Sequence, residues 1–122
     1  PAAGRLIETE IEETTMAQFR GGMNELMRQA ARLQRKVEQT KKENEDKEVV
    51  ATAIGDKVKA TVKYSGKVSK IEIDPEFLKS EGIEIALEGV VVAVNAGIEQ
   101  ADKAMEAEVE KITGGVKIPG LT

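Results

Sequence analysis

The chain has 122 residues, 40% of them hydrophobic and 33% charged, which predicts one compact domain that is too polar to be embedded in a membrane. It contains no Cys, His or Trp, which excludes disulfides, Cys/His zinc sites and catalytic triads with imidazole as the base. Only three residues are aromatic, so a platform that stacks single-stranded bases on aromatic rings is not expected. The longest aliphatic run, Val90 to Val94, is far shorter than the roughly 20 residues that cross a bilayer.

Charge is distributed unevenly along the chain. The formal net charge is −4, yet residues 20–47 carry eight Lys or Arg against five Asp or Glu. Residues 75–113 carry three Lys against nine acidic residues. Residues 1–15 are acidic too, and because the chain begins with Pro we expect them to be an N-terminal extension or a non-native remnant. A surface for an anionic partner must be local, because the field of the whole molecule repels phosphate.

A long helix is predicted from Gly22 to about Lys47. Its composition is dominated by strong helix formers, it contains no Pro, and the pair Gly21-Gly22 marks its expected start. Apolar and small residues recur at alternating steps of three and four, which is the spacing of one helical stripe. This stripe consists of Met23, Leu26, Ala30, Leu33, Val37, Thr40 and Asn44.

Three strands joined by short glycine-containing turns are predicted next. In the second strand apolar side chains alternate with Lys and Thr, which predicts one buried and one exposed face. Val68 is out of phase with Ile71 and Ile73, so we expect a β-bulge near Ser69-Lys70. The predicted strands span Val49–Ile54, Lys57–Tyr64 and Lys67–Asp74.

A short helical turn and a second long helix complete the chain. Asp74 and Pro75 suit the N-cap and first position of the short helix, which we expect to run through Leu78. Glycines inside the second long helix, Gly89 and Gly97, would permit close packing, and Gly114-Gly115 ends this helix before a predicted loop. Its predicted apolar stripe consists of Leu87, Val91, Val94, Ile98, Ala101, Met105, Val109 and Ile112.

These elements predict an α+β fold: a long helix, a three-stranded antiparallel β-meander, a short helical turn and a long helix. A helix of about 26 residues is about 39 Å long, whereas an eight-residue strand spans about 26 Å. Part of the apolar stripes therefore projects beyond the sheet. We expect an intertwined or packed homodimer with projecting helical arms to cover it.

Three motifs follow one another along the chain. They are Gly21–Ala30 (GGMNELMRQA), Ile71–Pro75 (IEIDP) with Leu78, and Lys111–Gly115 (KITGG) with Ile118-Pro119-Gly120. In this order and spacing the chain resembles the YbaB/EbfC family of nucleoid-associated proteins over roughly residues 19–122. The resemblance implies a homodimer with tweezer-like arms, binding of double-stranded DNA with little sequence preference, and a cytoplasmic, nucleoid-associated location. It assigns residues 16–122 to a YbaB/EbfC-like domain. The second long helix is richer in Val and Gly than the family pattern.

The candidate DNA-binding residues lie on the first long helix. With Leu26 at 0° and about 100° per residue, the apolar stripe covers about −40° to 60°. A row of basic residues suits contact with phosphates, which positions a protein without reading bases. An ordinary solvated helix face is the alternative interpretation, and Glu25, Glu38 and Glu43 weaken the row. On the face opposite the stripe, between about 160° and 280°, lie Arg28, Arg32, Arg35, Lys36 and Lys42.

Other charged groups have less specific interpretations. Lysines of the predicted sheet (Lys57, Lys59, Lys63, Lys67 and Lys70) could extend a DNA surface, but protection against edge aggregation is favoured. The acidic residues Asp102, Glu106, Glu108 and Glu110 are more typical of a solvated face than of a cation or acid–base site. We therefore expect no enzyme activity, cofactor, metal or small-molecule substrate. The alternative function is a scaffold dimer whose acidic second helix binds a basic protein, with weak or no DNA binding.

Overall fold

The computed structural model describes the backbone of residues 2–114 and the side chains of residues 21–114. The predicted loop after Gly114 lies outside these residues. Two compact units are present, Pro1–Arg35 and Lys36–Thr122, and each is described by itself. The division of the chain between residues 15 and 16 stays a prediction.

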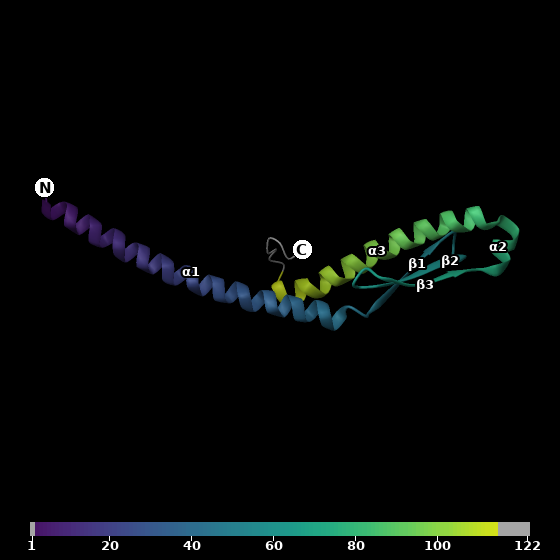
Figure 1. Ribbon diagram of the computed structural model, residues 1–122, viewed down its shortest axis with the longest axis horizontal. Coiled ribbons are helices and arrows are strands. Elements are labelled where there is room, and N and C mark those ends of the chain that lie inside the picture. Colours follow the sequence, from purple (N-terminus) through teal and green to yellow (C-terminus); the bar gives the residue numbers. More distant parts are fainter. Residues whose placement is uncertain (1, 115–122) are drawn as a thin grey trace. The chain divides into compact units, whose positions relative to one another are not determined.

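The first helix, α1, spans Ala2–Asn44 (Figure 1). The predicted start at Gly22 is wrong, because the helix continues through Gly21 and Gly22. Each glycine costs only about 1 kcal/mol in a helix interior, and the flanking sequence is rich in Ala, Glu, Met and Arg, which favour helix strongly enough to offset that cost. At the other end of α1, the amide of Asn44 donates a hydrogen bond of 2.7 Å to the carbonyl of Thr40. Asn44 and Val37 of the predicted stripe are buried.

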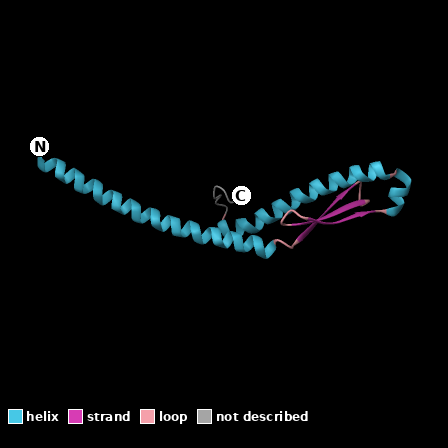
Figure 2. Ribbon diagram, in the orientation of Figure 1, coloured by secondary structure: helices cyan, strands magenta, loops and turns pink. Residues whose placement is uncertain are grey.

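The three predicted strands are confirmed as β1 (Glu48–Ala53), β2 (Val58–Lys63) and β3 (Val68–Ile73). They form one antiparallel sheet in the order β1-β2-β3 (Figure 2). The predicted bulge is also confirmed: Thr61 pairs with Lys70 and Val62 with Val68, which leaves Ser69 as the additional residue. The extra residue returns Val68 to the same face of the sheet as Ile71 and Ile73.

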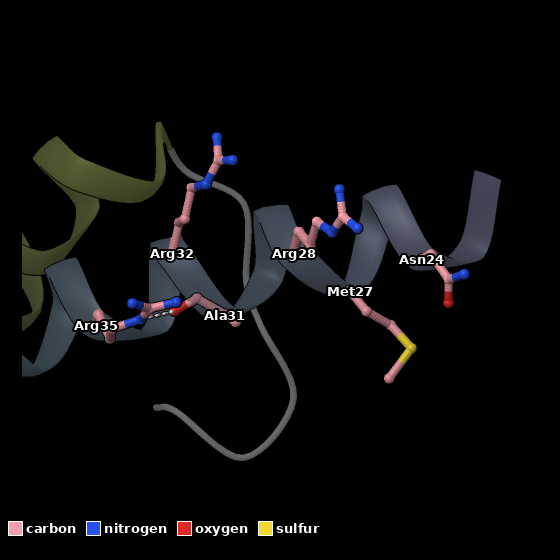
Figure 3. A pocket seen from close by; sticks show the side chains of 6 residues that line it. All are labelled: Asn24, Met27, Arg28, Ala31, Arg32 and Arg35. Carbon is pink, nitrogen blue, oxygen red and sulfur yellow. Dashed lines mark hydrogen bonds between the residues drawn. The ribbon is translucent and has the colours of Figure 1, made fainter. Parts of the chain in front are cut away.

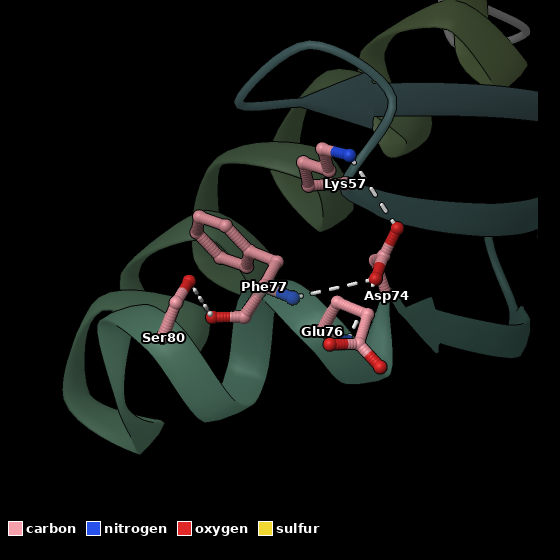
Figure 4. Close-up of polar contacts among 5 residues, drawn as sticks. All are labelled: Lys57, Asp74, Glu76, Phe77 and Ser80. Atoms are coloured by element: carbon pink, nitrogen blue, oxygen red, sulfur yellow. Dashed lines mark hydrogen bonds and ion pairs between the residues drawn. The ribbon is translucent and has the colours of Figure 1, made fainter.

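Helix α2 (Pro75–Glu81) follows the sheet directly, and its predicted cap is confirmed. The Oδ1 atom of Asp74 accepts hydrogen bonds from the backbone N–H groups of Glu76 (2.9 Å) and Phe77 (3.3 Å) (Figure 4). These two bonds, with a smaller contribution from Lys57, hold the pKa of the Asp74 carboxyl below its usual range. The helix extends beyond the predicted end at Leu78, and Asp74 fixes the point where the chain leaves β3.

Helix α3 (Ile83–Thr113) ends at Gly114, whose φ of 64° is the left-handed conformation predicted for a terminating glycine. It packs mainly on β1 and β2, and much less on β3 (Figure 1). Val58, Ala60 and Val62 of β2 are fully buried beneath it, as their alternation predicts. The predicted α+β fold is thus confirmed.

Most of the first half of the predicted apolar stripe of α3 does not face the sheet, although Val94 packs against the core. Leu87, Val91 and Ile98 are exposed, and only Ala101 and Val109 of the stripe are buried. Small residues face the sheet instead: Ala86, Gly89, Ala93, Gly97 and Ala101. A Cβ atom on Gly97 would lie 2.6 Å from Cγ2 of Val62, so the contact requires glycine there. The close approach predicted for the two helix glycines is confirmed, and it decides which side of α3 is covered.

Candidate nucleic-acid interface

Three of the five candidate DNA-binding residues lie together on α1. Arg28, Arg32 and Arg35 line an open concavity of about 490 Å³ on the helix surface (Figure 3). Their spacing of four and three residues places them on one side of the helix. The Nε–H of Arg35 donates to the carbonyl of Ala31 at 3.4 Å, which orients this side chain along the helix. Three residues of the predicted basic face thus share one surface of α1, and their role in DNA binding stays a prediction.

None of the six residues that line this surface is acidic, although Glu25 and Glu38 flank it along the chain. Between Leu26 and Val37 the sequence holds four basic residues and no acidic one. All three arginines are exposed, and none forms an ion pair within residues 21–114. A guanidinium group presents several N–H donors and a permanent positive charge, a combination that suits phosphate oxygens. This part of the acidic chain can therefore attract an anion.

The remaining two candidates do not belong to this concavity. Lys36 and Lys42 are exposed on the part of α1 that lies in the second unit. Conversely, Asn24 and Met27 line the concavity, although the sequence interpretation left them out. The helical arithmetic that selected the arginines places Asn24 at about 160°, at the edge of the basic face. Helical spacing alone thus places Asn24 beside the arginines, but a selection by charge leaves out this uncharged residue.

The lysines of the sheet are mostly paired. Lys57 contacts Asp74 at 3.5 Å, Lys63 contacts Asp46 at 3.2 Å, and Lys70 contacts Glu72 at 2.6 Å. The hydrogen bond between Lys70 and Glu72 raises the pKa of the lysine and lowers that of the glutamate. Three of the five sheet lysines are thus neutralised by neighbours, and their role in DNA binding stays a prediction.

Two acidic residues of α3, of which only Glu108 is among the four candidates named from the sequence, form ion pairs with lysines. Lys103 contacts Glu99 at 3.1 Å, and Lys111 contacts Glu108 at 3.2 Å. Within the described part of the chain, no group of three His, Cys, Asp or Glu residues has a geometry that could hold a metal ion. Nor does any helix in residues 2–114 have the length and apolar character needed to cross a membrane.

Comparison with known proteins identifies the family of the chain. The model of the YbaB/EbfC DNA-binding family matches residues 19–116. The chain belongs to this family. The resemblance carried by the three sequence motifs is therefore confirmed.

Several relatives share most of their length with the chain. A nucleoid-associated protein of Clostridium acetobutylicum is 37% identical over 101 residues, which cover 83% of this chain and 90% of the relative. A nucleoid-associated protein of Alkaliphilus metalliredigens is 41% identical over 101 residues, covering 81% and 87%. One from Acetivibrio thermocellus is 36% identical over 104 residues, covering 84% and 92%.

A solved structure shares the fold. It is an uncharacterized protein from Helicobacter pylori, similar with a TM-score of 0.59 and 17% sequence identity. The match covers 73% of this chain and 94% of the other. At this identity the likeness shows the fold alone.

Proposed function

We propose that this member of the YbaB/EbfC family binds double-stranded DNA at the nucleoid in the cytoplasm, with low sequence specificity, and acts without enzymatic chemistry or a cofactor. One observation carries the proposal: three exposed arginines, Arg28, Arg32 and Arg35, share one helix surface in a chain of net charge −4, and none of them forms an ion pair with a residue of 21–114. A local cationic row binds the phosphate backbone, which is the same for every sequence. Lys36 and Lys42 add phosphate contacts from exposed positions.

We further propose that the protein acts as a homodimer. The support comes from the large apolar side chains that the protomer leaves exposed on α3, including Leu87, Val91 and Val92. β3 leaves Val68 and Ile71 exposed on the face of the sheet that α3 covers only in part. A second copy that packs on these surfaces would remove them from water. The dimer would then present two basic α1 rows to one duplex.

Fluorescence anisotropy of a labelled 30-base-pair duplex tests the DNA proposal. The protein is titrated at several salt concentrations with two duplexes of unrelated sequence. Each phosphate contact contributes about −0.9 to the log–log slope of affinity against salt. The three arginines and two lysines of one arm predict a slope of about −4.5, and two arms predict about −9. The slope therefore also reports whether one or two arms bind.

A matched pair of triple variants locates the binding surface. Arg28→Gln, Arg32→Gln and Arg35→Gln together remove three positive charges from α1, and we expect them to weaken binding strongly and flatten the salt slope. Lys57→Gln, Lys63→Gln and Lys70→Gln remove the same charge from the sheet and serve as the control. Equal losses in both variants would contradict the assignment to α1. Failure of the unaltered protein to bind either duplex at low salt would overturn DNA binding and favour the scaffold function.

A further inference from the structure

The arginine-lined concavity has a second side whose own residues are uncharged, and Arg35, which donates to the carbonyl of Ala31, lies between the two sides. The residues that line the concavity together with the three arginines are Asn24, Met27 and Ala31. Figure 3 shows Arg28 and Arg32 projecting from one side of α1, whereas Asn24 and Met27 project from the other. One helix surface thus joins a cationic flank, Arg28 and Arg32, to a neutral flank, Asn24, Met27 and Ala31.

The two flanks suit different parts of a DNA duplex. Phosphates favour the cationic flank, but an amide and two apolar side chains gain little from a phosphate. A carboxamide presents a donor and an acceptor side by side and can pair with N6–H and N7 of adenine in the major groove. Apolar side chains such as those of Met27 and Ala31 can contact the neighbouring thymine methyl group. The neutral flank therefore matches the edge of an A·T pair.

Helix dimensions permit this arrangement. An α-helix with its side chains is about 10–12 Å across, and the major groove of B-DNA is about 12 Å wide. Asn24 precedes Arg28 by four residues, or about 6 Å along the helix axis. The Asn24 side chain is exposed and makes no hydrogen bond to another residue whose side chain the structure describes. Its amide can approach a base edge without first losing an internal partner.

We propose that Asn24 is a specificity-determining residue that contacts adenine in the major groove while Arg28 and Arg32 hold the adjacent phosphates. This inference rests on the proposed DNA-binding function and adds to it a modest preference for A·T pairs. Affinity comes from the arginines, so the preference is small compared with the total binding. Met27 and Ala31 support the contact through the thymine methyl group.

Duplexes that contain 7-deazaadenine test this contact. The modified base lacks the N7 acceptor in the major groove but keeps normal base pairing and the minor-groove edge. Anisotropy titrations compare two 30-base-pair duplexes of one mixed sequence, with adenine or with 7-deazaadenine throughout. We expect the unaltered protein to bind the modified duplex at least about five-fold more weakly, the lower end of what one bidentate base contact contributes.

Two variants assign the effect to Asn24. Asn24→Ala should bind both duplexes equally and keep the salt slope of the unaltered protein, because no phosphate contact is lost. Gln29→Ala removes another exposed amide from α1, at about 300° on the helix, and should retain the five-fold difference. Circular dichroism and sedimentation confirm that both variants keep the helix content and oligomeric state of the parent.

The outcomes separate the inference from the function on which it rests. Equal affinity of the unaltered protein for the two duplexes, with a steep salt dependence, would overturn base contact by Asn24 and leave phosphate binding standing. A five-fold difference that survives Asn24→Ala would overturn the assignment to this residue. Failure to bind either duplex would overturn the proposed function itself.

Discussion

Helix α3 and residues 21–35 of α1 are both amphipathic, but they differ in which residues the protomer covers. α3 turns Ala and Gly toward the sheet and leaves Leu87 and Val91 exposed. In residues 21–35 of α1 no side chain is buried, and Leu26 is 65% exposed. Small residues thus make the contacts inside the protomer, whereas large apolar residues and arginines remain available to partners. The contrast supports the proposed dimer and the proposed DNA contacts of α1.

The largest expected effect comes from placing a charge on the exposed side of α3. Val91→Glu should raise the dimer dissociation constant by about 100-fold or more, because an unpaired carboxylate would be buried in the proposed interface. Val50→Glu provides a closely matched control. Val91 is 60% exposed and Val50 57% exposed, but Val50 lies in β1 on the side away from α3, since its neighbour Ala51 is buried. Analytical ultracentrifugation measures both dissociation constants.

If Val50→Glu dissociates the dimer and Val91→Glu does not, the interface lies on the outer face of the sheet. If neither does, the exposed α3 residues are not the contact between copies. DNA titrations of a dissociated variant add a further test. Loss of one arm should halve the salt slope if two arms bind one duplex.

The next largest effect concerns the covered side of α3. Gly97→Ala should lower the free energy of unfolding by about 1–2 kcal/mol, because overpacking at a site with no room costs more than the helix gains from alanine. The new Cβ would meet Val62, which is fully buried and cannot move aside. Urea denaturation at fixed protein concentration measures the change. An unchanged or raised stability would mean that α3 can move away from the sheet without loss.

Much of the fold could be predicted from the sequence because its signals are local. The alternation in β2, the bulge at Ser69 and the Asp74-Pro75 helix start each depend on residues within one element or turn, and all are confirmed. The basic face of α1 was also predictable, since helical spacing alone places Arg28, Arg32 and Arg35 together.

The covered side of α3 could not be predicted from hydrophobicity. Its largest apolar residues form the stronger stripe, yet close packing on the sheet selects Gly89, Ala93 and Gly97. Hydrophobic periodicity shows that a face avoids water, but it does not distinguish the sheet of the same chain from a partner. The predicted start of α1 at Gly22 was wrong for a different reason. The free energy that two glycines cost in a helix is smaller than the free energy that the surrounding helix formers contribute.

A smaller effect is expected at the cap that places α2 and α3. Asp74→Ala should lower the melting temperature by a few degrees, because the N–H groups of Glu76 and Phe77 lose their acceptor. Asp74→Asn keeps an acceptor oxygen and should retain most of the stability. The contribution of this side chain to stability should then no longer depend on pH. The pKa of Asp74 is lowered in the folded state, so its contribution is present above the ordinary aspartate pKa and is lost as pH falls through the lowered value.

Thermal melts of the parent and both variants between neutral pH and about pH 3 measure this effect. The difference between the parent and Asp74→Asn should be constant near neutrality and shrink below about pH 4, the ordinary range of an aspartate. A difference that grows as the pH falls would contradict the capping role of the ionised carboxylate.

The smallest expected effect gives the most direct comparison of packing around α1 and α3. Gly22→Ala makes the same substitution as Gly97→Ala, but a Cβ atom on Gly22 would meet no other atom within 4 Å. Alanine there should stabilise α1 by up to about 1 kcal/mol, since only the helix propensity changes. Circular dichroism should show slightly higher helix content and a later loss of helix on heating. A destabilising Gly22→Ala would mean that this part of α1 is closely packed in the assembled protein, as α3 is on its sheet.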